Sequence, residues 1–285
     1  MNVFEQLFKK QLSGKYIFRG ISEENQKYPS IMRCNGNDLS YLENKMLEQF
    51  VIRGSHMLDG NLSPIDIIGY AQHYGLPTRL IDWTLNPFVA LYFAINNVSE
   101  EAVPRILFTK ISDQIMLNKI VSPRTWNDVS YAGNETDVKL YQKFLNVVSN
   151  KEEFVNIISS EYTLNSAEES SENIKLALQD KYEKNRFILV QSHLSNPRII
   201  AQQGLYMIPK QLNRKSIMDE YSKSNVGELK INLSDINIHL EMLKKLGITQ
   251  SKLFCDLQSV CSEIKFDSIK GSKRCDKENK IVNKD

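Results

Sequence analysis

The most constraining feature of the sequence is the run AQHYGLPTRLIDWTLNPFVALYFAI at residues 71–95, in which a polar segment leads directly into an apolar one. Residues 78–84 have the composition of a short strand. The helix predicted to follow, at residues 86–98, has Asn86 as its N-cap and Pro87 in its first turn. Its longest apolar stretch has the length of a buried helix, so the polar residues before it are concentrated at a strand-to-helix junction.

Short strands alternate irregularly with helices along the rest of the chain, which favours an α+β fold over a doubly wound sheet. We expect a mixed, mostly antiparallel sheet of short strands, flanked by helices and interrupted by a helical insertion at about residues 112–183. A single domain is expected over residues 1–266, and a poorly ordered, polar and basic tail over residues 267–285. The predicted helices outside the insertion are at residues 3–12, 38–50, 63–75, 86–98, 234–247 and 250–266. The predicted strands are at residues 16–20, 78–84, 103–111, 186–192, 204–208 and 228–233.

The composition excludes several functional classes. The formal net charge is only +2, with 36 basic and 34 acidic residues, so it does not support a surface dedicated to tracking phosphates. No apolar run is long enough to span a bilayer, and the first residues lack the plan of a secretory signal, so we expect a cytoplasmic protein without a membrane partner. The four cysteines and four histidines are scattered without CxxC or HExxH spacing, so no metal site is expected.

The first candidate site residue is Arg19, in the motif YIFRG at residues 16–20. An arginine at the end of an apolar strand leaves the core at its rim, and Gly20 next to it permits close approach of another backbone or a ligand. Such an arginine is suited to a bidentate grip on phosphate or carboxylate. It is equally suited to a structural ion pair, for example with Asp82.

The second cluster follows in HYGLPTRLIDWT, which contains His73, Arg79, Asp82, Trp83 and Thr84. His73 is predicted near a helix C-terminus, where a cap or packing role is the commoner one. Asp82 at a strand end must be exposed or paired, and it could hold an arginine or orient a ligand hydroxyl. Trp83 could stack on a planar ring or fill the core.

The third cluster, NPRIIAQQGLYMIP, brings Arg198, Gln202, Gln203 and Gly204 immediately before an apolar strand. Paired glutamines can read the polar edge of a base or an amide, or satisfy backbone groups. Neither the phosphate-loop pattern GxxxxGK[ST] nor the dinucleotide pattern GxGxxG occurs.

The motifs YIFRG, AQHYGLPTRLIDWTLNPFVALYFA and RIIAQQGLYMIP together resemble the FRG-domain family, which is named after the first of them. The closing LKKLGITQSKLFCDLQSVCSEI also resembles the end of the family, with CDLQS at residues 255–259 where PDLDG is usual. The resemblance covers about residues 16–264, and the family occurs mostly in bacterial and phage-related proteins.

A second, weaker resemblance is to the ADP-ribosyltransferases. The segment IDWTLNPFVALYFA is similar to their strand that leads into an N-P-x-x-A helix, Arg19 fits their first motif, and QQGLYMIP looks like their late strand. This resemblance implies NAD as the cofactor. It implies the catalytic residues Arg19, Asp82 and Gln202, and the cofactor-binding residues Arg19, Gly20, His73, Tyr74, Arg79, Trp83, Thr84 and Gln203. Gln202 and Gly204 stand where glutamates would be expected, so Asp82 is the nearest acid in the motifs.

Three functions remain open from the sequence. The first is an NAD-dependent ADP-ribosyltransferase-like enzyme, acting as a toxin or anti-phage effector on a protein or nucleic-acid acceptor. The second is a binding module that senses a nucleotide, a nucleic acid or a phage protein without turnover. The third is a hydrolase that uses Asp82 and His73. In each nucleotide-binding case Arg19, Asp82 and Gln202 should converge in one cleft.

Overall fold

The computed structural model of the protein describes residues 2–58, 64–117, 145–156, 171–191, 197–266 and 268–269. In this part of the chain seven strands form one sheet in the order β4-β5-β6-β2-β1-β3-β7. All neighbouring pairs are antiparallel except β4 and β5. The strands are β1 (Tyr16–Ile21), β2 (Ile81–Thr84), β3 (Arg105–Lys110), β4 (Ile115–Leu117), β5 (Ile188–Val190), β6 (Gly204–Ile208) and β7 (Gly227–Lys230). The expected α+β class with a mostly antiparallel sheet is therefore confirmed.

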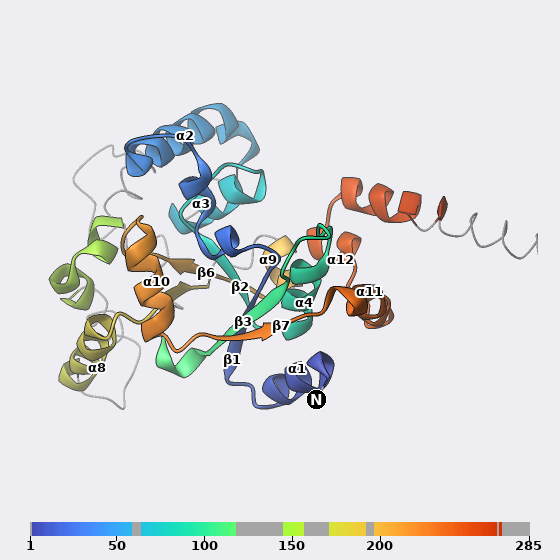
Figure 1. The fold of residues 1–285 in the computed structure, drawn as a ribbon. Coiled ribbons are helices and arrows are strands. Elements are labelled where there is room, and N and C mark those ends of the chain that lie inside the picture. Colours follow the sequence, from blue (N-terminus) through green and yellow to red (C-terminus); the bar gives the residue numbers. More distant parts are fainter. Residues whose placement is uncertain are drawn as a thin grey trace, which may run out of the picture.

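Helices cover the sheet, and Figure 1 shows α2 and α3 grouped apart from α4 and α11. The α-helices are α1 (Val3–Leu12), α2 (Leu39–Gly54), α3 (Pro64–His73), α4 (Pro87–Ile95), α8 (Ser171–Glu183), α9 (Pro197–Gln202), α10 (Arg214–Lys223), α11 (Ile236–Lys245) and α12 (Gln250–Phe254). Short 3-10 helices include η1 (Glu24–Lys27) and η2 (Ser30–Arg33). Residues 145–149, 151–156 and 257–266 are also helical.

The local signals explain several helix ends. The side chain of Asn86 accepts a hydrogen bond from the backbone N–H of Phe88 and caps α4, as expected. The carboxylate of Asp38 accepts from the N–H of Tyr41 at the start of α2. Gly75, with φ +92°, follows α3 in the left-handed region that glycine favours. Ser63, the first residue of the helix expected at residues 63–75, lies outside the described residues.

Three features of the elements were not predicted. The described part of the insertion is mostly helical, as expected, but it also contains strand β4, which pairs in parallel with β5. The last predicted helix is interrupted, because Cys255 adopts a left-handed φ of 54° and ends α12. Helices α9 and α10 were not predicted; α9 has only six residues, too few to display a helical period. The expected tail lies outside the described residues except for the helical residues 268–269.

Three apolar clusters form the core. One joins α2, α3 and α8 to β4, β5 and β6, and a second joins α1, α4, α11 and α12 to β1 and β3. The third, which includes Trp83, packs α10 against β1, β2, β5 and β6. Strand β1 approaches α4 closely, because a Cβ on Gly20 would lie 1.8 Å from the carbonyl oxygen of Ala90. Gly20 therefore serves the packing of a helix on a strand.

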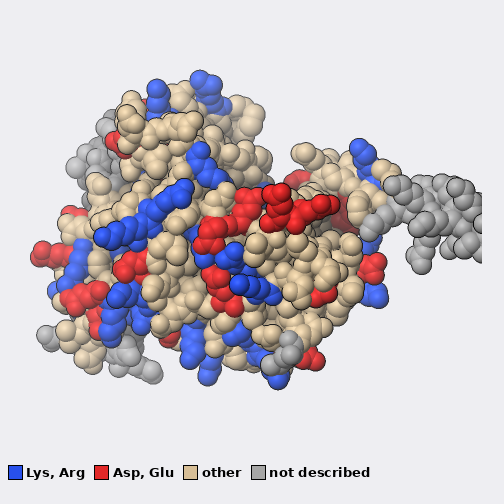
Figure 2. Space-filling model, in the orientation of Figure 1, with Lys and Arg blue, Asp and Glu red and all other residues tan. Residues whose placement is uncertain are grey.

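The surface carries charges of both signs. Figure 2 shows lysines and arginines interspersed with acidic side chains over the face in view. Within the described residues, no helix is both long and apolar enough to cross a membrane.

Candidate functional site

The sheet is nearly split between β1 and β2. A single residue pair, Phe18 with Thr84, joins these strands, whereas β1 and β3 pair continuously from Tyr16 with Lys110 to Ile21 with Arg105. Backbone groups of β1 and β2 that lie outside this single pair need other hydrogen-bond partners. The side chain of Arg19 supplies one, because its Nη1 donates to the backbone carbonyl of Asp82.

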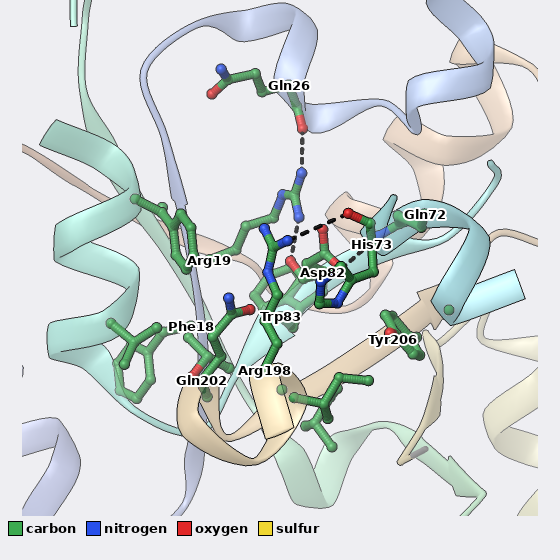
Figure 3. A pocket seen from close by; sticks show the side chains of 18 of the residues that line it. Phe18, Arg19, Gln26, Gln72, His73, Asp82, Trp83, Arg198, Gln202 and Tyr206 are labelled. Atoms are coloured by element: carbon green, nitrogen blue, oxygen red, sulfur yellow. Dashed lines mark hydrogen bonds between the residues drawn. The ribbon is translucent and has the colours of Figure 1, made fainter. Parts of the chain in front are cut away.

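A pocket of about 320 Å3 opens at this split. Strands β1, β2 and β6 and helices α3, α4 and α9 line it, together with Gln26 of η1 and Arg33 of η2. Figure 3 shows Arg19, Asp82 and Gln202 around the pocket, although they are distant in the sequence. The expected convergence of these three residues in one cleft is therefore present in the structure.

The positive charge of Arg19 is not neutralised by a carboxylate. Its Nη2 donates to the carbonyl oxygen of Gln26 at 2.8 Å, and its Nη1 donates to the carbonyl of Asp82. Among the described residues no ion pair involves Arg19, and its buried Nε has no hydrogen-bond partner. Carbonyl oxygens orient the guanidinium but leave its net charge in place, so the pocket retains a fixed cation.

Asp82 provides the pocket with its carboxylate. Its side chain is open to solvent but lies deep in a concave site, where the surrounding protein displaces much of the water. This loss of hydration raises the pKa of Asp82, while the charges of Arg19 and Arg198 oppose the rise. Gln72 donates from Nε2 to Oδ1 of Asp82 at 2.6 Å and also favours the ionised form.

Arg198 of α9 brings a second cation to the pocket. Its guanidinium carbon lies 4.2 Å from the centre of the Phe254 ring, a cation–π contact, and its Nη1 donates to the carbonyl of His73 at 3.5 Å. Burial lowers the pKa of Arg198, and the negative charge of Asp82 opposes this. Burial also lowers the pKa of His73, and the charge of Arg198 adds to the effect.

Thr84 and Gln202 join β2 to the end of α9. The Thr84 hydroxyl donates to the carbonyl of Gln202 at 2.6 Å. The side-chain amide of Gln202 donates to the carbonyl of Leu253 at 3.0 Å, so α12 holds this residue in place. Both residues line the pocket, and both also have structural contacts.

Trp83 is a core residue. It contributes to the pocket wall, but only 2% of the residue is exposed, and its ring lies 5.6 Å from Phe187 and 6.2 Å from Tyr221, centre to centre. The ring is therefore held among other aromatic side chains and is not free to stack on a ligand. The commoner of its two roles, filling the core, is the one that the structure shows.

Three of the expected cofactor-binding residues lie outside the pocket. Arg79 is 5% exposed and forms a 2.6 Å ion pair with the fully buried Glu43. Tyr74 is 72% exposed and contacts the His73 ring. Gln203 adopts a φ of 48° between α9 and β6, and its carbonyl accepts from the N–H of Leu85.

Several pocket residues were not assigned from the sequence. Tyr206 pairs with Asp82 across β6 and β2, and burial together with the charge of Asp82 raises its pKa. Strand alternation in GLYMI could have placed Tyr206 on the Asp82 face only if the pairing of β2 with β6 had been known. Gln72 and Arg33 carried no signal in the sequence, because their position depends on how α3 and η2 pack against β2.

The comparisons with known proteins identify one domain. Residues 14–102 match the family model described as the FRG domain. The comparisons with curated proteins and with solved structures gave no match. The matched residues include Arg19, Gln72 and Asp82, while Arg198, Gln202 and Tyr206 lie beyond them.

Proposed function

Because the chain contains an FRG domain at residues 14–102, we propose that this domain contributes to an NAD-binding pocket and that the protein is an ADP-ribosyltransferase-like enzyme. The observation that carries the proposal is the pairing of an un-neutralised arginine, Arg19, with a solvent-open carboxylate, Asp82, in one concave site. Both residues line the pocket, and the positive charge of Arg19 also favours the ionised form of the Asp82 carboxylate.

The charges in the pocket favour an anionic ligand. Arg19, Arg33 and Arg198 line it with Asp82 as the one acidic residue among its lining residues. The η-nitrogens of Arg19 that bind carbonyls each carry a second N–H, which can donate to a phosphate oxygen. The pyrophosphate of NAD supplies such oxygens, and its ribose hydroxyls supply donors for Asp82. The volume of about 320 Å3 lies at the lower end of the range for small-molecule sites, so part of the dinucleotide extends out of the pocket.

The proposed reaction breaks the bond between nicotinamide and C1′ of the ribose. The electron pair of this bond leaves with nicotinamide and neutralises its ring, and a nucleophile of the acceptor donates a pair to C1′ while its proton passes to solvent. Positive charge develops on the ribose in the transition state, and the carboxylate of Asp82 stabilises it electrostatically. Asp82 therefore stabilises the positive charge on the ribose, which the neutral side chain of Gln202 cannot do.

The acceptor and the biological role follow from the family resemblance. We propose a protein or nucleic-acid acceptor, and a role as a bacterial toxin or anti-phage effector in the cytoplasm. The hydrolase alternative has less support, because its only basis is that His73 and Asp82 line the same pocket, and the His73 ring packs against the exposed Tyr74.

A nucleotide sensor without turnover is the second candidate function. It is favoured by Gln202, whose side-chain amide is already bound to the carbonyl of Leu253 and carries no charge. In that case the pocket binds NAD or ADP-ribose and changes the protein's affinity for a partner.

Incubation of the purified protein with NAD labelled in both the nicotinamide and the adenosine parts, with and without cell lysate, separates the two candidates. The enzyme should release nicotinamide, and Asp82→Asn should lower the rate by about 100-fold or more, since one electrostatic group is worth about that much. Asp180→Asn, at an exposed helix position, is the matched control and should release nicotinamide at the same rate as the parent. Binding without release identifies the sensor, and a parent that neither binds nor cleaves NAD refutes both.

A further inference from the structure

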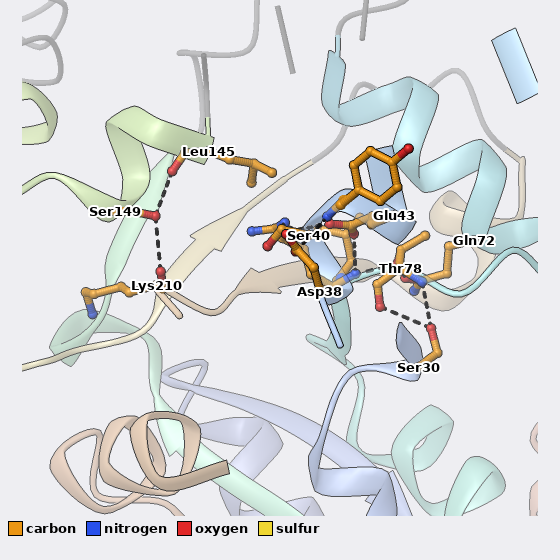
Figure 4. A network of polar contacts seen from close by, with 12 residues as sticks. Ser30, Asp38, Ser40, Glu43, Gln72, Thr78, Leu145, Ser149 and Lys210 are labelled. Carbon is orange, nitrogen blue, oxygen red and sulfur yellow. Dashed lines mark hydrogen bonds and ion pairs between the residues drawn. The ribbon is translucent and has the colours of Figure 1, made fainter. Parts of the chain in front are cut away.

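A chain of hydrogen bonds behind the pocket ends on Asp82. Gln72 of α3 donates from its amide nitrogen Nε2 to Oδ1 of Asp82 at 2.6 Å, and its amide oxygen Oε1 accepts a short hydrogen bond from the hydroxyl of Thr78. Figure 3 shows Gln72 beside Asp82, and Figure 4 shows Thr78 between Gln72 and Ser30. None of these contacts was foreseen from the sequence.

The hydroxyl of Thr78 fixes which way the Gln72 amide points. Its oxygen already accepts from the backbone N–H of Leu80 at 3.2 Å, and its one proton is donated to the amide oxygen of Gln72. A flipped amide would place two donors against the hydroxyl proton and an oxygen against the carboxylate of Asp82. The amide nitrogen must therefore face Asp82.

Thr78 is itself held rigidly. It is fully buried, its backbone N–H donates to the Ser30 hydroxyl at 2.9 Å, and that hydroxyl donates to the carbonyl of Thr78 at 3.1 Å. The orientation of Gln72 thus rests on a buried residue, Thr78, that connects the segment before β2 to η2.

We infer that Gln72, locked by Thr78, is a positioning residue that holds Oδ1 of Asp82 and leaves Oδ2 available to a ligand hydroxyl in the pocket. Among the described residues outside Asp82 itself, Gln72 alone donates a hydrogen bond to this carboxylate. The inference rests on the proposed function only in assigning the ligand, since the hydrogen-bond chain exists without one. A carboxylate with one oxygen fixed and one open accepts a hydroxyl, such as those of ribose, in a defined geometry.

Other charged groups near Asp82 set the background against which Gln72 acts. Arg19 from β1 and Arg198 from α9 favour its ionised form. Arg33, His73 and Tyr206 line the same pocket. A neutral substitution of Gln72 alters none of these charges, so a change in the titration of Asp82 reports the loss of the donated hydrogen bond.

The test is a carboxyl 13C titration of Asp82 by NMR in the ligand-free protein, for the parent, Gln72→Met, Thr78→Val and Thr78→Ser. Loss of a donor to the ionised form should raise the titration midpoint of Asp82 by about one pH unit in Gln72→Met. Thr78→Val, which frees the amide to flip, should raise it too, while Thr78→Ser keeps the hydroxyl and should restore the parent value. Gln203→Met, outside the pocket, is the control.

Equal midpoints in the parent and Gln72→Met overturn the inference, because a merely structural glutamine would not move the titration. Should Thr78→Val be too unstable to titrate, Gln72→Met decides alone. A second measurement uses ADP-ribose: its affinity should fall in Gln72→Met about tenfold, in step with the altered carboxylate. A parent that does not bind ADP-ribose counts against the proposed function, whereas the ligand-free titration still decides the role of Gln72.

Discussion

At the scale of single residues, Arg19 combines two tasks. It fills a gap in the backbone hydrogen bonding between β1 and β2 through the carbonyls of Asp82 and Gln26, and it keeps a positive charge beside the pocket. A guanidinium can do both because it is planar and presents its donors in a fixed fork. An ion pair with Asp82, the structural alternative raised by the sequence, is absent among the described residues, since Arg19 binds the backbone of that residue.

Arg19→Lys should therefore weaken ADP-ribose binding by about tenfold, because a single ammonium group retains the charge but cannot reach both carbonyls and a phosphate. Calorimetry measures the affinity, and thermal melts separate it from a loss of folding. Arg53→Lys, on the exposed part of α2, should leave the affinity for ADP-ribose and the melting temperature unchanged. If Arg19→Lys binds ADP-ribose as tightly as the parent does, Arg19 is not part of the ligand-binding site.

Glu220 is a buried acid away from the pocket. It is fully buried, and burial raises its pKa to about 7, an effect that the charge of Lys210 and a hydrogen bond from the Lys210 N–H only partly offset. Since the folded-state pKa is above the unfolded value, its stabilising contribution is complete below pH 4.5 and is lost as the pH rises toward 7.

Between pH 5 and pH 8 the parent should lose about 2–3 kcal/mol of unfolding free energy relative to Glu220→Gln, which does not titrate. Denaturant unfolding of both proteins across this range measures the difference, and other titrating groups cancel in the comparison. Glu101→Gln, at an exposed position, is the control substitution. A constant difference between parent and Glu220→Gln would mean that Glu220 is ionised throughout.

At the scale of elements, the contact between β1 and α4 depends on a missing side chain. A Cβ on Gly20 would lie 1.8 Å from the carbonyl oxygen of Ala90 and 2.6 Å from the backbone nitrogen of Ala94. Both are backbone atoms of a buried helix, so they cannot turn aside as a flexible side chain would. Because α4 also lines the pocket, a displaced helix reaches the site.

Gly20→Ala should therefore destabilise the protein by about 3 kcal/mol or more, at the upper end of the range for overpacking, and should weaken ADP-ribose binding through the shift of α4. Chemical unfolding gives the first quantity and calorimetry the second. The control is Gly54→Ala, where a Cβ meets no atom within 4 Å and stability should stay equal or rise slightly. A stable Gly20→Ala protein would contradict the packing described for β1 and α4.

At the scale of the whole molecule, the sequence predicted what is encoded locally. The Asn86 cap, the short apolar strands and the α+β class follow from patterns within a few residues, and they are present in the structure. The grouping of Arg19, Asp82 and Gln202 was predicted from strand ends. The roles of Arg79 and Trp83 could not be, because they depend on Glu43 and on Phe187, which are distant in the sequence. Gln72 was missed for the same reason, because its hydrogen bond to Asp82 forms only after α3 packs on β2.

The distribution of the pocket along the chain also has a consequence for protein synthesis. Arg19 is made early, Gln202 much later, and Leu253, which holds the Gln202 side chain, later still. At ribosomal speeds of roughly 5–20 residues per second, on the order of ten to forty seconds separate the first of these residues from the others. A nascent chain cannot assemble the pocket during that interval. A toxin of the proposed kind would therefore be inert while attached to the ribosomes of the cell that makes it, and would gain its ligand only after α12 has emerged.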